Sequence, residues 1–341
     1  MRPWLNGVAL SCAVAGALMG PVQAQTPQAQ TPQARDFPVG EGAVLEDRYP
    51  DRLQAWPGGV SSLADVTYST IPGYRPMVMD IYMPPRDAGP KPLVLFVHGG
   101  GWVGGHTRHS GAAADFPAAL ARLAAEGFVV ASVEYRLAQE ARFPAQLQDV
   151  RAALRFMKAN AARYGVDPSR AAVWGGSAGG HLSALTALSC GAPGIDPAGS
   201  TAAPGSECVQ AAVIWYGVFD FAALAASRAD REDPAAVTLL GCKDRCTPAQ
   251  YAPASPVTYI DGRDPPMLLI HGEGDRVVPV AQSHLAEARL KAAGVPVQSI
   301  YIPGVDHSFI GASPGQTRAA TLTALNATFD FFHAQLDGAA R

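Results

Sequence analysis

Short apolar runs alternate with amphipathic stretches along most of the chain. Nearly continuous apolar runs occur at residues 92–97, 129–134, 170–174, 210–215, 266–271 and 297–302. Runs of this length are typical of strands that are buried on both faces of a parallel sheet. Residues 65–69 and 78–83 predict a leading antiparallel pair, joined by Pro72-Gly73. The pattern therefore predicts eight strands.

Helical periodicity lies between these runs. In residues 146–164, apolar side chains recur every three or four positions, and Pro144 and Gly165 bound the segment. Further helices are predicted at residues 280–293 and 316–336. Strands that alternate with helices predict an α/β fold with a mostly parallel sheet covered on both faces. Four basic residues mark the side of the first helix that is predicted to face water: Arg151, Arg155, Lys158 and Arg163.

Two insertions interrupt the alternation around the sixth strand. Residues 191–207 precede that strand and residues 219–254 follow it. Ligands of open α/β sheets bind outside the carboxyl ends of the strands. We expect both insertions to form a small lid or rim there, with a solvent-exposed decoration as the alternative.

The N-terminal segment has the layout of a secretory signal peptide. Arg2 supplies a positive charge, residues 8–19 are apolar, and Val22-Gln23-Ala24 offers a cleavage site. Residues 1–24 are therefore expected to be removed. Residues 25–36 are rich in Pro and Gln and predict a disordered linker. Residues 37–341 are expected to form one catalytic domain.

Composition and charge narrow the classes of partner. Hydrophobic residues make up 48% of the chain, as in packed globular proteins, and the formal net charge is −3. This charge gives no reason to expect nucleic acid or an anionic membrane as a partner. No internal apolar run approaches the roughly 20 residues of a membrane span, so no integral span is expected.

The most informative motif is the sequence Trp-Gly-Gly-Ser-Ala-Gly-Gly at residues 174–180. It follows a predicted strand and precedes the helix-like residues 181–188. A Gly-x-Ser-x-Gly turn between a strand and a helix is the context of a nucleophile elbow, which exposes the serine hydroxyl above the sheet. Ser177 is therefore the candidate nucleophile.

Three more motifs occur at the ends of apolar runs, in a fixed order. A glycine-rich loop at residues 98–102 precedes Ser177, and Asp275 and then His307 follow it. The order Ser, Asp, His is that of α/β-hydrolases and differs from the order in chymotrypsin and subtilisin. His307 would accept the proton of Ser177, and Asp275 would orient the imidazole. Asp220, after the sixth strand, is the alternative acid.

These motifs resemble a known family. The chain is similar to α/β-hydrolase serine esterases of the hormone-sensitive-lipase-like and bacterial feruloyl-esterase-like esterase/lipase group. Residues 98–102, 175–180, Asp275 and His307 carry the resemblance, which runs from about residue 65 to 332. It implies the α/β-hydrolase fold, with a mostly parallel eight-stranded sheet.

The oxyanion of an acyl-transfer intermediate requires preorganised donors. Elbow geometry assigns one of them to the N–H of Ala178, and the resemblance implies Gly100 and Gly101 as the others. Trp102 is the candidate substrate contact. We expect His98 to brace this loop, and His181 to pack on the helix after Ser177. His106 and His109 either line a substrate cleft or are solvated.

Four cysteines follow the predicted signal peptide. An even number in an exported chain indicates disulfides, with three possible connectivities. Cys190 with Cys208 and Cys242 with Cys246 are the favoured pairs, because they flank the first insertion and a short loop. Free buried thiols and a zinc site are the alternatives. No histidine lies near either pair in the sequence, which disfavours zinc.

The sequence thus favours an exported serine carboxylesterase, located in the periplasm or outside the cell. We expect it to act on small-molecule or carbohydrate-linked esters of short acyl, acetyl or hydroxycinnamoyl (feruloyl) groups, without metal or cofactor. An amidase, arylformamidase-like or peptidase-like hydrolase is the alternative. A non-catalytic binding protein is less favoured, because Ser177, Asp275 and His307 are all present. The oligomeric state is open.

Overall fold

The computed structural model describes residues 52–85, 89–197, 203, 205–228 and 233–337. The predicted signal peptide and linker, residues 1–36, lie outside the described residues. Of the helices within the described part of the chain, none has the length and apolar character that a membrane crossing requires.

A single sheet of nine strands forms the centre of the folded body, in the order β1-β2-β3-β5-β4-β6-β7-β8-β9. The first three pairings in this order are antiparallel and the others are parallel. The strands are β1 (Arg52–Ala55), β2 (Ser61–Ser69), β3 (Met77–Met83), β4 (Lys91–Val97), β5 (Val129–Val133), β6 (Val166–Gly176), β7 (Ala211–Trp215), β8 (Met267–Gly272) and β9 (Val297–Ile302).

All eight predicted strands are present, and the predicted antiparallel pair is β2 and β3. The ninth strand, β1, pairs with β2 at the sheet edge. Sequence reasoning missed it because its four residues are all exposed and include a single large apolar side chain, Leu53, so they form no apolar run. The predicted number of strands is therefore too low by one.

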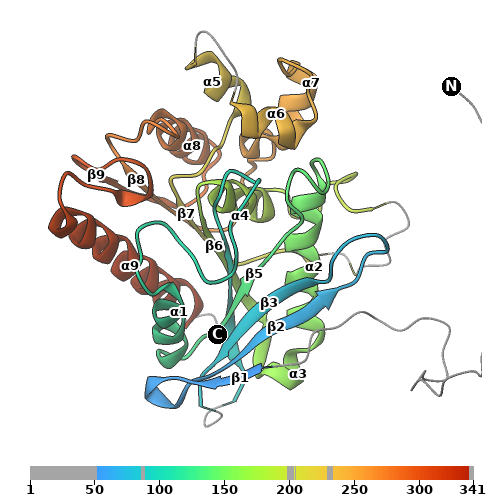
Figure 1. Ribbon diagram of the computed structural model, residues 1–341, viewed down its shortest axis with the longest axis vertical. Helices are drawn as coiled ribbons and strands as arrows, with labels where there is room; N and C mark the ends of the chain where they lie inside the picture. The colour runs from blue at the N-terminus through green and yellow to red at the C-terminus, as the bar shows by residue number, and fades with distance from the viewer. Residues whose placement is uncertain (1–51, 86–88, 198–202, 204, 229–232, 338–341) are drawn as a thin grey trace, which may run out of the picture. The chain divides into compact units, whose positions relative to one another are not determined.

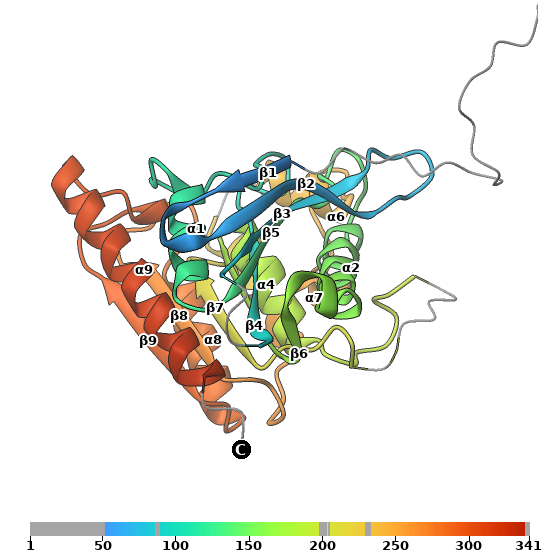
Figure 2. The same ribbon diagram turned by 90° about the horizontal axis from the view of Figure 1, so that it is seen from below.

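Helices cover both faces of the sheet (Figures 1 and 2). Aromatic and aliphatic residues of α1 and α9 pack on one face, around Trp174, and those of α2, α4 and α8 pack on the other. The α/β-hydrolase fold class is thus confirmed. The helices are α1 (Phe116–Ala125), α2 (Ala145–Ala159), α3 (Ala161–Tyr164), α4 (Ala178–Leu188), α5 (Phe221–Ala226), α6 (Pro234–Leu240), α7 (Pro248–Ala254), α8 (Ala281–Ala292) and α9 (Pro314–Leu336).

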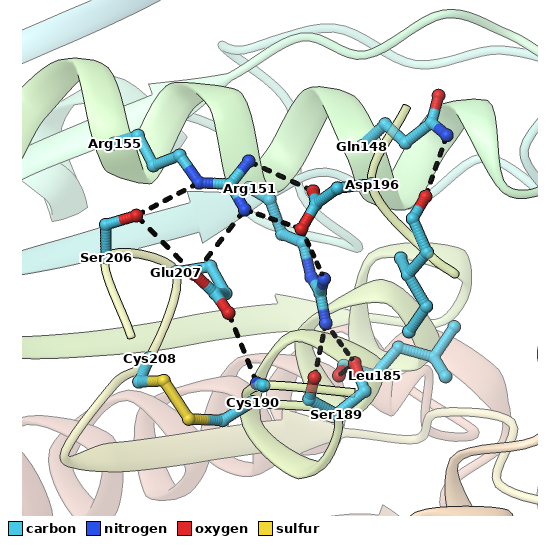
Figure 3. A network of polar contacts seen from close by, with 12 residues as sticks. Gln148, Arg151, Arg155, Leu185, Ser189, Cys190, Asp196, Ser206, Glu207 and Cys208 are labelled. Carbon is cyan, nitrogen blue, oxygen red and sulfur yellow. Dashed lines mark hydrogen bonds and ion pairs between the residues drawn. A yellow bond between two sulfur atoms is a disulfide. The ribbon is translucent and has the colours of Figure 1, made fainter. Parts of the chain in front are cut away.

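The predicted helix 146–164 differs from the structure in its solvent-facing side. Arg163 is exposed, but Arg151 is fully buried and the side chain of Arg155 is only 18% exposed. Arg151 donates to the Ser189 hydroxyl at 2.8 Å and to the Ser189 carbonyl, and both arginines pair with Asp196 (Figure 3). Helical periodicity alone predicted that this side of the helix faces water, because Asp196, the acidic partner of Arg151, lies 45 residues further along the chain.

The first insertion is the segment that covers these arginines. Its ends are joined by the Cys190–Cys208 disulfide, and Lys158 of α2 donates to the Cys208 carbonyl at 2.6 Å. Since α4 starts at the carboxyl edge of the sheet and runs back along it, the loop after α4 lies at the opposite edge. The described residues of this insertion therefore do not form the rim at the carboxyl edge that we predicted for residues 191–207.

The second insertion follows the carboxyl end of β7 and forms α5, α6 and α7 (Figure 1). Its described residues include the Cys242–Cys246 disulfide. Both disulfides are the pairings that the sequence favoured. The backbone N–H of Phe143 donates to Leu239 of α6 at 2.9 Å, which fixes this insertion to the segment before α2.

Candidate active site

Ser177 lies in a strained turn between β6 and α4. Its backbone has φ 57° and ψ −122°, a combination that L-residues rarely adopt. A Cβ atom on Gly179 would lie 2.0 Å from the Val97 carbonyl, and one on Gly175 would lie 2.4 Å from the Gly179 carbonyl. Glycine at both positions therefore permits the sharp turn that the sequence motif predicted.

The structure brings Ser177, His307 and Asp275 together. The Ser177 Oγ lies 2.9 Å from Nε2 of His307, and the His307 Nδ1 lies 2.7 Å from Oδ2 of Asp275. In this arrangement the hydroxyl donates to one ring nitrogen and the other donates to the carboxylate. The three side chains thus form the hydrogen-bonded chain that proton transfer from a serine requires.

The Asp275 carboxylate is fixed by further donors. Its Oδ1 accepts from the backbone N–H groups of Val277 and Val278 at 2.9 and 2.8 Å, and Nε2 of His271 lies 3.2 Å from its Oδ2. Burial alone would raise the pKa of Asp275, but hydrogen bonds from His271 and His307 hold it well below its usual range. The carboxylate is therefore ionised at neutral pH.

His271 is a residue that sequence reasoning missed. It is fully buried at the end of β8, and its Nδ1 lies 2.7 Å from the Ser283 hydroxyl. A histidine at the end of an apolar strand, four residues before the candidate acid, is the signal that could have revealed it.

Two other aspartates have different roles. Asp220, the alternative acid, accepts from the backbone N–H of Ala223 at 3.0 Å and caps α5. Asp306 accepts from the backbone N–H groups of Arg276 and His307, at 2.9 and 2.7 Å. Asp306 therefore fixes the backbone of the histidine loop.

The glycine-rich loop lies beside Ser177. Gly100 and Gly101 have φ values of 110° and 61°, and both line the same pocket as Ser177. His98 braces the loop as expected: its ring stacks on Tyr135 at 4.4 Å, and its Nδ1 lies 2.7 Å from the Gly99 carbonyl. Burial lowers the pKa of His98 to about 4, so the imidazole is neutral.

Trp102 does not line the pocket. Its side chain is buried against Phe221, and its indole N–H donates to Nδ1 of His181 at 3.1 Å. The prediction that Trp102 contacts substrate is therefore wrong, because the backbone at φ 61° turns the ring into the core.

His181 connects three parts of the site. It belongs to the first turn of α4, accepts from Trp102 of the glycine-rich loop and donates through Nε2 to the Ala254 carbonyl at 2.7 Å. Burial lowers its pKa to about 4. The neutral ring thus ties the glycine-rich loop to α4 and to the end of α7.

The pocket above Ser177, here called the nucleophile pocket, has a volume of about 480 Å³. Besides the residues already described, it is lined by Gly105, His109, Ser110, Gly111, Gly176, Tyr216, Val277, Ser308 and Ile310. Sequence reasoning proposed His106 and His109 as cleft residues, and only His109 is among the lining residues. Tyr216, which it missed, has φ 37° and contacts the His307 ring edge-on at 4.8 Å.

The described residues of the second insertion support the pocket from outside. Arg228 donates to the Val277 carbonyl, and a Cβ on Gly101 would lie 3.6 Å from the Cβ of Ala235. Arg228 and Ala235, which belong to the insertion, do not themselves line the nucleophile pocket. The described part of the insertion thus lies at the carboxyl edge as predicted, and it contacts two residues of the pocket wall, Val277 and Gly101.

Comparison with known proteins identifies a family whose members share this fold. The fold and the elbow define an α/β-hydrolase, and the BD-FAE family model matches residues 79–290, more than half of the chain. The chain belongs to the BD-FAE family. The predicted resemblance to the esterase/lipase group is thereby confirmed.

Two similar curated proteins come from Mycobacterium tuberculosis. Esterase LipC is 35% identical over 70% of this chain and 58% of its own length. Esterase LipQ is 32% identical over 75% of this chain and 59% of its own length. The chain thus spans a little over half the length of the curated relatives it matches.

Solved structures include similar esterases. A truncated carbohydrate esterase from gut microbiota is 31% identical, with a TM-score of 0.66, over 80% of this chain and 95% of its own. Esterase 2 of Thermogutta terrifontis is 24% identical, with a TM-score of 0.65, over 84% of this chain and 96% of its own. The second likeness concerns the fold alone.

Proposed function

We propose that this protein is a serine carboxylic ester hydrolase that acts through an acyl-enzyme. The observation that carries the proposal is the hydrogen-bonded chain from Ser177 through His307 to Asp275, with distances of 2.9 and 2.7 Å. The names of the relatives as esterases and carboxylic ester hydrolases support it.

In the proposed reaction, Ser177 Oγ attacks the carbonyl carbon of the ester while its proton passes to Nε2 of His307. The resulting oxyanion accepts hydrogen bonds from the N–H of Ala178 and from Gly100 and Gly101. Collapse of the intermediate breaks the bond to the alcohol oxygen, which takes the proton from His307. Water then attacks the acyl-enzyme, with His307 as base, and releases the acid and Ser177.

Two kinds of acyl group are proposed. The first is acetyl and other short chains, and the second is hydroxycinnamoyl groups such as feruloyl. Support comes from the likeness to a carbohydrate esterase, and from an esterase 2 structure titled as propionate-bound, which is 25% identical with a TM-score of 0.63. The proposed substrates are small-molecule or carbohydrate-linked esters.

A substrate panel tests the reaction class. The purified protein is assayed with p-nitrophenyl acetate, acetylated sugars, methyl ferulate and aryl amides. Ester turnover that exceeds amide turnover supports the proposal. Turnover of the amides alone would favour the amidase alternative, and no turnover of any substrate by the wild-type protein would contradict both.

We further propose that the protein is exported to the periplasm or beyond. Disulfides form and persist in oxidising compartments, and two are present among the described residues. Expression of the full chain followed by cell fractionation and N-terminal sequencing tests this. A mature N-terminus near Gln25 in the exported fraction is expected, and an uncleaved cytoplasmic product would contradict the proposal.

A further inference from the structure

A second concavity lies next to the nucleophile pocket, between the segment that precedes α1 and the first turns of α9, which lie side by side (Figures 1 and 2). We call it the α1–α9 groove. Its volume is about 640 Å³, within the range of small-molecule sites. One wall consists of residues 112–115 and Ala119, and the other of residues 311–314 and side chains of α9. None of its lining residues is aromatic.

The groove and the nucleophile pocket share a boundary in both walls. Gly111 and Ile310 line the nucleophile pocket, and their chain neighbours Ala112 and Gly311 line the groove. A small hollow beneath this boundary is lined by Gly111 and Ala112 together. The two concavities are therefore adjacent, and a ligand that occupied both would cross the boundary between residues 111–112 and 310–311.

Exposed apolar side chains line both the nucleophile pocket and the groove. Among the described residues, six large hydrophobic side chains are exposed, and three of them line these two concavities. Val277 and Ile310 are 48% and 51% exposed at the nucleophile pocket, and Leu322 is 38% exposed in the groove. Single exposed apolar residues are ordinary, but half of the exposed large apolar side chains of the described residues lie at these two concavities, which favours an apolar ligand.

The direction of the groove decides which part of an ester it would receive. The proposed reaction requires His307 to protonate the departing alcohol oxygen, so the alcohol portion lies next to the His307 ring. Ser308 and Ile310, which follow His307 in the chain, line the side of the nucleophile pocket that adjoins the groove. The oxyanion donors, Ala178 and the glycines, lie on the β4 and β6 side of Ser177.

We propose that the α1–α9 groove is a binding site for the aliphatic chain of the leaving alcohol. The inference rests on the proposed ester hydrolysis and, among the proposed substrates, favours small-molecule esters of aliphatic alcohols over carbohydrate-linked esters. Most lining residues are alanine, proline or leucine, and none is aromatic, which favours an alkyl chain over a flat ring. Asp115 and Arg318, which also line the groove, are exposed to water. Each methylene that the groove removes from water raises kcat/KM by about fourfold at most.

Acetate esters of increasing alcohol length test the groove. With the acyl group held constant, kcat/KM of the wild-type protein is expected to rise at least tenfold from methyl acetate to octyl acetate. Leu322→Gln places an amide in the groove, and Ala112→Trp fills it. Each variant is expected to lower kcat/KM for octyl acetate at least fivefold more than for methyl acetate. Leu53→Gln makes the matched change on an exposed leucine of β1, and it should alter neither value.

The outcomes separate the two proposals. A wild-type protein that hydrolyses methyl acetate with no dependence on alcohol length would overturn the groove and leave ester hydrolysis intact. Equal losses on both esters in Leu322→Gln and Ala112→Trp would also overturn it. If the wild-type protein hydrolyses neither these acetates nor p-nitrophenyl acetate, the proposed function fails, and the groove proposal fails with it.

Discussion

The two edges of the sheet are built in different ways. At the carboxyl edge, the residues around the nucleophile pocket hold unusual backbone conformations, with φ of 57° at Ser177, 37° at Tyr216 and 61° at Ser308. At the opposite edge, the regular helix α2 holds a loop through Arg151 and Arg155, and a disulfide joins the ends of that loop. Strained backbone is thus concentrated where chemistry is proposed, whereas the Cys190–Cys208 disulfide and the ion pairs of Arg151 and Arg155 restrain a loop away from it.

This difference indicates that activity and stability are separable in this protein. Removing a group at the carboxyl edge should change turnover and leave the fold intact. Removing a restraint at the opposite edge should change stability and leave substrate affinity unaltered. The predictions below test that separation.

The largest effect is expected for Ser177→Ala. Without the hydroxyl no acyl-enzyme forms, so kcat should fall on the order of 10⁴-fold or more. The melting temperature should stay within a few degrees of the wild-type value, measured by circular dichroism. Retention of more than a few per cent of kcat would exclude Ser177 as the nucleophile.

Asp275→Asn should lower kcat by roughly 10³- to 10⁴-fold with little change in KM, because the amide cannot favour the imidazole tautomer that accepts the serine proton. Asp220→Asn is the matched control. It retains a side-chain oxygen that can cap α5, so its kcat should remain near that of the wild type. Steady-state kinetics of both variants decide between the two acids, and the opposite result would reassign the role to Asp220.

At the other edge, replacement of Cys190 and Cys208 by serine should lower the free energy of unfolding. In the chain-entropy model, a disulfide that closes a loop with a sequence separation of 18 contributes about 3 kcal/mol. Denaturant titration measures the loss. KM should not change, because the loop lies away from the nucleophile pocket. A raised KM with unchanged stability would place the loop at the site after all.

Acidification should destabilise the fold through two buried histidines. The pKa of His98 and His181 is lowered to about 4 in the folded state, so the unfolded chain binds more protons between about pH 6.5 and 4. Stability contributed by the neutral rings is present above that window and is lost as pH falls through it. Each histidine should account for about 2 kcal/mol between pH 7 and 5.

His181→Gln gives this pH prediction a test. It keeps a polar side chain in α4 and removes the titrating group, so its unfolding free energy should fall less between pH 7 and 5 than that of the wild type. Urea titrations at the two pH values measure the difference. An identical pH dependence in variant and wild type would show that His181 does not contribute.

Eight of the strands and the candidate triad could be predicted from the sequence because their signals are local. Ser177, Asp275 and His307 lie three, four and five residues beyond the ends of apolar runs, so chain order alone brings their loops to one edge of a parallel sheet. Burial of Arg151 could not be predicted in this way, since it depends on Asp196, which approaches only after α4 has crossed the sheet.

Trp102 and Tyr216 show the same limit at the scale of single side chains. Both follow segments that the sequence identified, and both have positive φ values, 61° and 37°. A residue in that region points its side chain away from the direction that a regular strand or turn would give it. The indole of Trp102 therefore lies in the core, and Tyr216 lines the pocket.

The proposed oxyanion donors have a consequence for how this protein could evolve. They are main-chain amides of Ala178, Gly100 and Gly101, so no side chain supplies the donated hydrogen, and only a proline would remove one outright. The pocket walls, in contrast, are side chains carried by loops, such as His109, Val277 and Ile310. Mutational drift can therefore change what is bound while the means of stabilising the intermediate is inherited with the backbone.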